Sequence, residues 1–233
     1  MRRAVIGLPV VGSLAGLRAQ TRTGLDATIE GGVRFDDPRA RNDCGGADSI
    51  HQIAVQADLD YGFENTLECW DNMYPAKPAG PQLTARTARE AFDLLVAAMP
   101  GFDWKEMRGV VVVRPTTAWT DSGDILNLRT AAFQLTDAPF NYVLHTVLHG
   151  VTPALLYPWH QPAPRAAMTT TLSMTYNGGP LLDALNAMVR AKHPAFWLVG
   201  YRGEPKRGTV SIRTFRPGAG VAYPITLPQR SSR

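Results

Sequence analysis

The sequence lacks the short motifs that accompany several common catalytic sites. No GxSxG elbow frames a serine nucleophile, and no GxGxxG or Walker pattern precedes a helix. The HExxH signature of zinc peptidases is also missing, because Thr146 stands where the glutamate would follow His145. These absences favour a non-enzymatic protein, and the sequence predicts no cofactor.

Cysteine is also scarce. The 233 residues include two cysteines, Cys44 and Cys69, and neither lies in a CxxC motif or beside a histidine. In an exported chain such a pair is most simply one disulfide. The bond would close a loop of about 25 residues and stabilise the fold by about 3 kcal/mol in the chain-entropy model.

The apolar run at residues 4–17 is too short to cross a membrane, which takes about 18 residues. Arg2 and Arg3 precede this run, and cleavage after Ala19 would leave a small residue at the new end. The pattern predicts a Sec-type signal peptide over residues 1–19 and a periplasmic or secreted mature chain without a membrane span. An N-terminal core strand is the alternative.

Positive charge is modest once the predicted signal peptide is set aside. The full chain has a formal net charge of +4, and residues 1–19 contain three arginines and no acidic residue, which leaves +1. This weak charge does not favour nucleic acid as a partner. Residues 33–115 hold 9 basic and 13 acidic residues, whereas residues 125–216 hold 9 and 3. This opposition of charge predicts docking between the two halves, a separate partner for each half, or simply two differently solvated surfaces.

The clearest pattern is a unit that occurs twice, an amphipathic helix followed by a two-stranded hairpin. Ala91 and Trp104 in the first copy match Ala184 and Trp197 in the second, both at an offset of 93 residues. We therefore expect an α+β fold of two tandem small domains, each roughly β-α-β followed by β-α-β-β, with helices packed on small mixed sheets. The expected segments are a signal peptide (1–19), a flexible lead-in (20–32), a first domain (33–115), a linker (116–127), a second domain (128–216) and a tail (217–233).

Local signals place the elements of the first copy. Thr87 and Glu90 form a capping box that predicts the start of a helix, and Pro100 with Gly101 predicts its end. The four valines at 110–113 predict a buried strand. In the second copy we expect a helix over 180–192 and a hairpin of 196–201 with 209–215.

Short hydrophobic motifs mark both halves: AFDLL and GVVVV in the first (91–95, 109–113), and AL and VSI in the second (184–185, 210–212). On these motifs, residues 33–215 resemble two copies of the secretin and TonB short N-terminal domain, STN. STN domains are small periplasmic modules of outer-membrane secretins and TonB-dependent receptors, where they make protein–protein contacts. The resemblance implies a similar fold here and a protein partner in the cell envelope.

Two histidines provide the candidate metal ligands. His145 and His149 lie four residues apart on a predicted helix, a spacing that can place both imidazoles on one metal ion, and His160 follows as a possible third ligand. A structural helix face is the simpler interpretation. We expect no metal and keep the pair as the basis of an alternative, metal-dependent function.

Carboxylates gather around one predicted strand and its loop, at Asp60, Glu64, Glu68 and Asp71. Paired carboxylates hydrolyse glycosides, so an envelope hydrolase is a second alternative. A charged strand end is the simpler interpretation.

Two groups of residues predict binding surfaces. Trp70 and Tyr74 lie in a proline-rich loop, where they either pack on the core or form an aromatic contact surface. Arg202, Lys206 and Arg207 form a basic hairpin turn that either binds an acidic partner or is a solvated tip. Exposed edge strands would also bind a partner by strand addition. The sequence thus predicts a non-enzymatic, exported interaction module of the bacterial cell envelope that binds an envelope protein.

Overall fold

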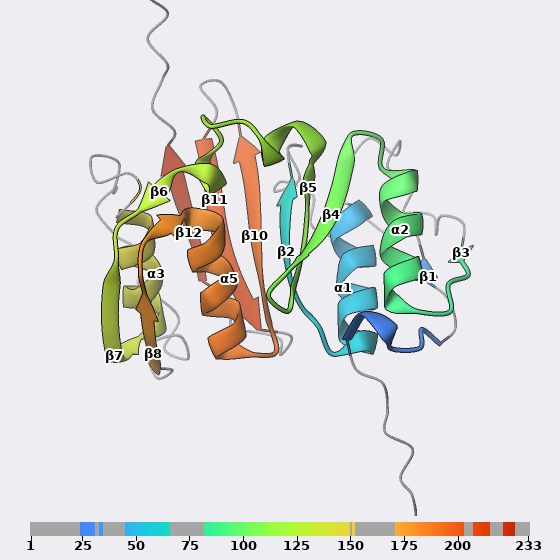
Figure 1. The fold of residues 1–233 in the computed structure, drawn as a ribbon, viewed down its shortest axis with the longest axis horizontal. Helices are drawn as coiled ribbons and strands as arrows, with labels where there is room; N and C mark the ends of the chain where they lie inside the picture. Colours follow the sequence, from blue (N-terminus) through green and yellow to red (C-terminus); the bar gives the residue numbers. More distant parts are fainter. Residues whose placement is uncertain are drawn as a thin grey trace, which may run out of the picture.

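The computed structural model describes residues 24–30, 33–34, 45–65, 82–149, 151, 171–202, 207–214 and 221–226. Figure 1 shows the fold. The elements of the first half are η1 (Gly24–Asp26), β1 (Val33–Arg34), α1 (Gly45–Ala57), β2 (Asp60–Asn65), β3 (Gln82–Leu83), α2 (Ala88–Ala98), β4 (Phe102–Met107) and β5 (Val110–Pro115). Those that follow are η3 (Thr116–Trp119), η4 (Ile125–Asn127), β6 (Arg129–Thr130), β7 (Phe133–Pro139), α3 (Phe140–His149), β8 (Thr171–Tyr176), β9 (Gly179–Pro180), α5 (Leu181–Lys192), β10 (Ala195–Arg202), β11 (Arg207–Thr214) and β12 (Val221–Thr226).

A six-stranded mixed sheet in the order β12-β11-β10-β2-β5-β4 forms the centre of the molecule (Figure 1). Strand β2 runs parallel to both of its neighbours, β10 and β5, whereas the hairpins β4–β5 and β10–β11 are antiparallel. The expected α+β class is confirmed. The division into two domains stays a prediction, and strands from both sequence halves hydrogen-bond in this one sheet.

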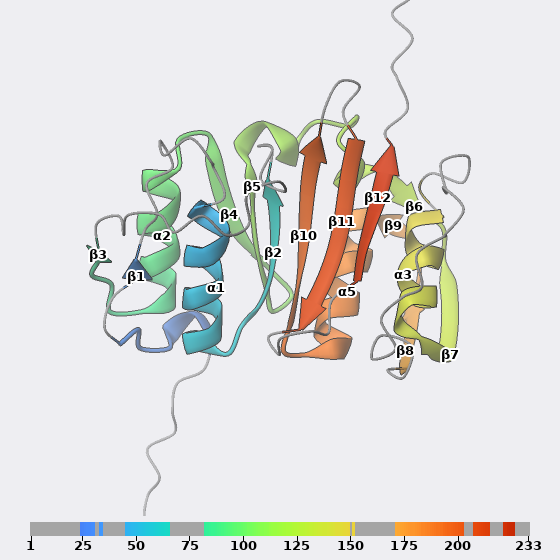
Figure 2. The ribbon, with the colours of Figure 1, turned by 180° about the vertical axis from the view of Figure 1, so that it is seen from behind.

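Helices cover the sheet on both faces (Figures 1 and 2). Along β5, Val110 and Val112 pack into the core beneath α5 and α3, whereas Val111 and Val113 pack into the core beneath α1 and α2. A strand that is buried on both faces has an unbroken run of apolar residues in its sequence, which explains the four consecutive valines.

The local signals of the first repeat copy correspond to observed contacts. The Thr87 Oγ1 atom accepts the Glu90 N–H at 3.2 Å, and the Glu90 carboxylate accepts the Arg86 N–H at 2.8 Å. Between β4 and β5, Arg108 (φ 54°) and Gly109 (φ 84°) both adopt positive φ. This is the backbone of a two-residue type I′ turn, whose twist matches that of the flanking strands.

Three stretches expected outside the folded domains contain packed structure. In the expected lead-in, Leu25 and Ile29 are buried, and in the expected linker Ile125 and Leu126 are almost fully enclosed. In the expected tail, β12 pairs with β11. Proline at position 224 does not prevent that pairing, because β12 is an edge strand and proline is tolerated at sheet edges.

Several predictions lie outside the described residues. These include the signal peptide at 1–19 and the disulfide between Cys44 and Cys69. Within the described part of the chain, no helix combines the length and apolar character needed to span a membrane.

Candidate functional site

The residues predicted to bind a partner are only partly described. Trp70, Tyr74 and Lys206 lie outside the described residues. Arg202 ends β10 and Arg207 begins β11, and the two are paired in the antiparallel register. The backbone therefore brings these two basic positions together at one end of the hairpin.

The candidate metal ligands His145 and His149 both lie on α3, as expected, whereas His160 lies outside the described residues. Among the residues that the structure describes, no group of three or more histidine, cysteine, aspartate or glutamate side chains is placed to hold a metal ion.

The predicted carboxylate cluster is divided between the two ends of β2. Asp60 begins the strand and accepts the Ala195 N–H at 2.9 Å, whereas Glu64 lies near its end and binds Arg114 at 2.7 Å. The other two carboxylates of that cluster lie outside the described residues. The described carboxylates therefore belong to two separate networks.

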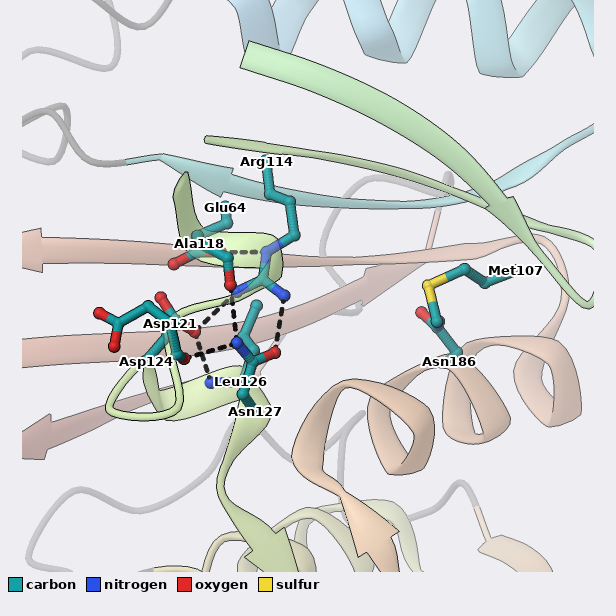
Figure 3. A network of polar contacts seen from close by, with 9 residues as sticks. All are labelled: Glu64, Met107, Arg114, Ala118, Asp121, Asp124, Leu126, Asn127 and Asn186. Atoms are coloured by element: carbon teal, nitrogen blue, oxygen red, sulfur yellow. Dashed lines mark hydrogen bonds and ion pairs between the residues drawn. The ribbon is translucent and has the colours of Figure 1, made fainter. Parts of the chain in front are cut away.

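Arg114 is fully buried at the centre of a polar network (Figure 3). The guanidinium donates from Nε to Glu64, from Nη2 to Asp124 at 2.7 Å and from Nη1 to Asn127 at 3.0 Å. Asp124 also accepts the Leu126 N–H at 2.9 Å, which caps η4. A buried arginine requires such partners because an unpaired charge is costly away from water. The sequence reasoning missed this network, although an arginine directly after four valines was a signal for it.

Asn127 extends the network into the connection after β5. Its amide donates to the carbonyl oxygens of Ala118 and Asp121, each at 2.7 Å. Beside it, the Trp119 ring lies 4.2 Å from the Lys105 ammonium and 5.1 Å from the Arg114 guanidinium carbon. The hydrogen bonds of Arg114 and Asn127 hold η3 and η4 on the sheet, so the network serves the fold, although the buried Trp119 indole N–H has no hydrogen-bond partner among the described residues.

A second polar cluster lies at the opposite end of β2. His193 Nδ1 lies 3.1 Å from Asp60 Oδ1, and its Nε2 lies 3.4 Å from Asp58 Oδ1. The imidazole of His193 therefore lies between the two carboxylates, one at each ring nitrogen. Burial raises the pKa of Asp60, while the Ala195 N–H and His193 act in the opposite direction.

The repeated tryptophans make the same contact in both copies. The Trp104 indole N–H donates to Asp93 Oδ1 at 2.9 Å, and the Trp197 indole N–H donates to Asn186 Oδ1 at 2.8 Å. Asp93 and Asn186 are themselves 93 residues apart. Each indole is thus fixed to the helix of its own copy. Asn186 also places its amide 3.9 Å from the Met107 sulfur (Figure 3).

The two tryptophans differ in what lies beside their strands. Trp197 is fully buried, and its register partner on the neighbouring strand β2 is Gly62. A Cβ atom at Gly62 would lie 1.9 Å from Cε2 of the Trp197 indole. Only glycine leaves room for the ring at this position.

Trp104 lies on β4, which is the last strand of the sheet and pairs only with β5 among the described strands. The ring is partly buried, packs against Phe92 at a centroid distance of 5.4 Å and lies 5.9 Å from the Arg89 guanidinium carbon. The Trp104 backbone N–H is capped by the neighbouring Asp103 carboxylate at 2.8 Å. We take this open edge of β4 as the candidate functional site.

Comparison of the chain with protein-family models, with curated proteins and with solved structures found no match to any of the three.

Proposed function

We propose that this chain is a non-enzymatic, exported interaction module of the bacterial cell envelope, STN-like in fold, which binds an envelope protein through the open edge of β4. The supporting observation is the difference between the two repeat copies. Strand β10 is hydrogen-bonded on both sides, whereas its counterpart β4 has a described strand on one side only. Strand addition to such an edge draws its affinity from main-chain hydrogen bonds.

The direction of the β4 peptide groups supports the same proposal. Bonded and non-bonded pairs alternate along an antiparallel ladder. The Thr116 N–H donates to the Gly101 carbonyl at 2.8 Å, so Gly101 and, two residues further along, Asp103 direct their peptide groups toward β5. The residues between and beyond them, including Trp104 and Glu106, direct their peptide groups to the open edge. The groups that a partner strand needs are therefore present there.

In this proposal, one polar contact between the two halves lies within the chain rather than at the partner surface. Asp58 and Asp60 of the acidic half meet His193 of the basic half at 3.4 and 3.1 Å. This contact lies at the start of β2 and β10, which pair in parallel. It is separate from β4.

The experiment is capture of envelope proteins by the tagged full chain and by two variants at one position. Glu106→Pro removes an N–H that faces the open edge and leaves the bonds to β5 in place, because proline is tolerated on edge strands. Glu106→Ala keeps that N–H and is the matched control. We expect a protein that is retained by the wild type and by Glu106→Ala and is lost with Glu106→Pro.

Equal retention by all three chains would overturn the assignment of β4. The paired variant Arg202→Glu with Arg207→Glu then tests the tip of the other hairpin, where the sequence predicted a basic contact. Circular dichroism and thermal unfolding of each variant establish that losses of binding do not come from loss of the fold.

A further inference from the structure

The repeat supplies a template for what the open edge of β4 binds. Hairpin β10–β11 is the second copy of hairpin β4–β5, and β2 occupies the side of β10 on which β4 has no described strand. The Ala195 N–H donates to Asp60 on β2, so Trp197, two residues further along, also directs its peptide group to β2. Trp104 directs its peptide group to the open edge in the same way. Corresponding residues of β4 and β10 therefore direct their peptide groups to the same side of their hairpins.

The template sets the direction and register of a bound strand. Strand β2 runs parallel to β10, with Gly62 opposite Trp197. Trp104 is held to its helix by the same indole hydrogen bond as Trp197, and the template extends the position of the Trp197 ring, over the adjacent strand, to Trp104. A residue with a side chain at that position would meet the ring, as a Cβ at Gly62 would at 1.9 Å.

Charge adds one more requirement, which the template does not supply. Asp103 corresponds to Phe196, whose partner on β2 is Tyr61, the residue before the glycine. The Asp103 carboxylate accepts the Trp104 N–H at 2.8 Å. A strand that pairs with β4 supplies a carbonyl to this N–H and releases the carboxylate. A lysine or arginine before the glycine then meets the released charge at the close distance of cross-strand neighbours.

We propose that the open edge of β4 binds an extended segment of a partner protein that runs parallel to β4, with glycine opposite Trp104 and lysine or arginine immediately before that glycine. This inference rests on the proposed strand-addition function and specifies its ligand. An edge whose charged residues only protect it against pairing, the other use of charge on edge strands, would not bind such a segment.

The probe is a fluorescein-labelled peptide with the sequence of residues 59–65, in which Tyr61→Lys supplies the basic residue before the glycine. Fluorescence anisotropy measures its binding to the full chain. We expect saturable binding that Glu106→Pro abolishes and that Glu106→Ala preserves or strengthens, because this register places Glu64 of the peptide opposite Glu106. A peptide that also carries Gly62→Val should bind about tenfold or more weakly, because its side chain meets the Trp104 ring. A peptide with Tyr61→Glu should also bind more weakly, since it places a carboxylate against Asp103.

Direction is tested with a nitroxide at either end of the same peptide. In the parallel arrangement, an N-terminal nitroxide broadens the amide signals of Gly101 and Phe102, and a C-terminal one broadens those of Arg108 and Gly109. The reverse pattern would overturn the parallel assignment. Equal binding of the glycine and valine peptides, or binding that Glu106→Pro leaves unchanged, would overturn the proposed ligand, as would the absence of binding by any peptide.

Failure of this inference is distinguishable from failure of the proposed function. If the capture experiment still yields a partner that depends on Glu106 while the peptides show no preference for glycine, strand addition stands and the ligand assignment falls. Sedimentation of the chain alone tests a second copy as the occupant. A dimer that dissociates on Glu106→Pro would replace the proposed peptide ligand.

Discussion

Gly62→Ala adds one methyl group at the centre of the six-stranded sheet. The backbone of Gly62 lies outside the positive-φ region, so alanine is allowed there, and the smaller entropy of the unfolded chain would alone favour it by about 0.4–1 kcal/mol. The added Cβ, however, would lie 1.9, 2.0 and 2.5 Å from three atoms of the Trp197 indole. Trp197 is fully buried, so the ring cannot move aside into solvent.

The steric effect decides the sign. Overpacking of a filled core costs about 1–3 kcal/mol, and contacts this short belong at the upper end of that range. After subtraction of the entropic gain, we expect a loss of about 2 kcal/mol or more in the free energy of unfolding. For a chain of this size that corresponds to a fall of about 4–8 °C in Tm.

Thermal and urea unfolding of wild type and variant measure this loss. A second background, Trp197→Leu, removes the indole, and there Gly62→Ala should cost about 1–2 kcal/mol less, a coupling typical of residues in contact. Gly101→Ala is the matched control. Gly101 has φ +87° and no atom within 4 Å of an added Cβ, so its cost of about 1–2 kcal/mol comes from the backbone alone and should be equal in both backgrounds. If Gly62→Ala were neutral, or equally costly in the two backgrounds, the steric argument would fail.

Three further predictions concern the polar clusters. Arg114→Met should lower the free energy of unfolding by about 3–5 kcal/mol, because it leaves buried carboxylates without their shared cation; Glu64→Gln, which keeps the pair with Asp124, should cost less in the same urea titration. Asn186→Ala should destabilise by about 1–3 kcal/mol, because it leaves the buried indole N–H of Trp197 without an acceptor, whereas Asp93→Ala at the exposed counterpart should cost clearly less, and equal costs would contradict this account. Burial raises the pKa of Asp60 above its ordinary value of 3.8, so the folded state binds this proton more tightly than the unfolded chain. Stability should therefore fall as pH rises from that value through the raised pKa. Asp60→Asn should remove that fall. If the free energy of unfolding of this variant, measured between about pH 3 and pH 6, kept the wild-type dependence on pH, the prediction would be contradicted.

Features encoded in neighbouring residues could be predicted from the sequence. The cap at Thr87, the end of α2 near Pro100 and the turn before the valine strand follow from side-chain chemistry within a few residues, and the structure contains each of them. The matching of Trp104 with Trp197 likewise anticipated two indoles in equivalent positions, although not their acceptors.

Features that depend on distant residues could not be predicted. The parallel pairing of β2 with β5 and β10 joins segments far apart in the chain, and no local pattern specifies such a pairing. Ile125 and Leu126 form an apolar pair too short to show a helical or strand period, so hydrophobic periodicity could not predict their burial. The position of β4 at the edge of the sheet could not be predicted for a related reason. The repeat gives Trp104 and Trp197 the same local signal, and only the strand order leaves one of them at an edge.

The central position of β2 also determines when the sheet is completed during synthesis. Strand β2 emerges early, but its partner β10 spans Ala195–Arg202, more than 130 positions later. Until β10 has been synthesised, one edge of β2 and the apolar face beneath α5 stay uncovered. Contacts of such long range slow folding and expose strand edges to aggregation in the meantime. A chain that ends before β10 keeps helices α1 and α2 but lacks the strand that covers Gly62. We expect such a fragment to require a chaperone that the complete chain does not.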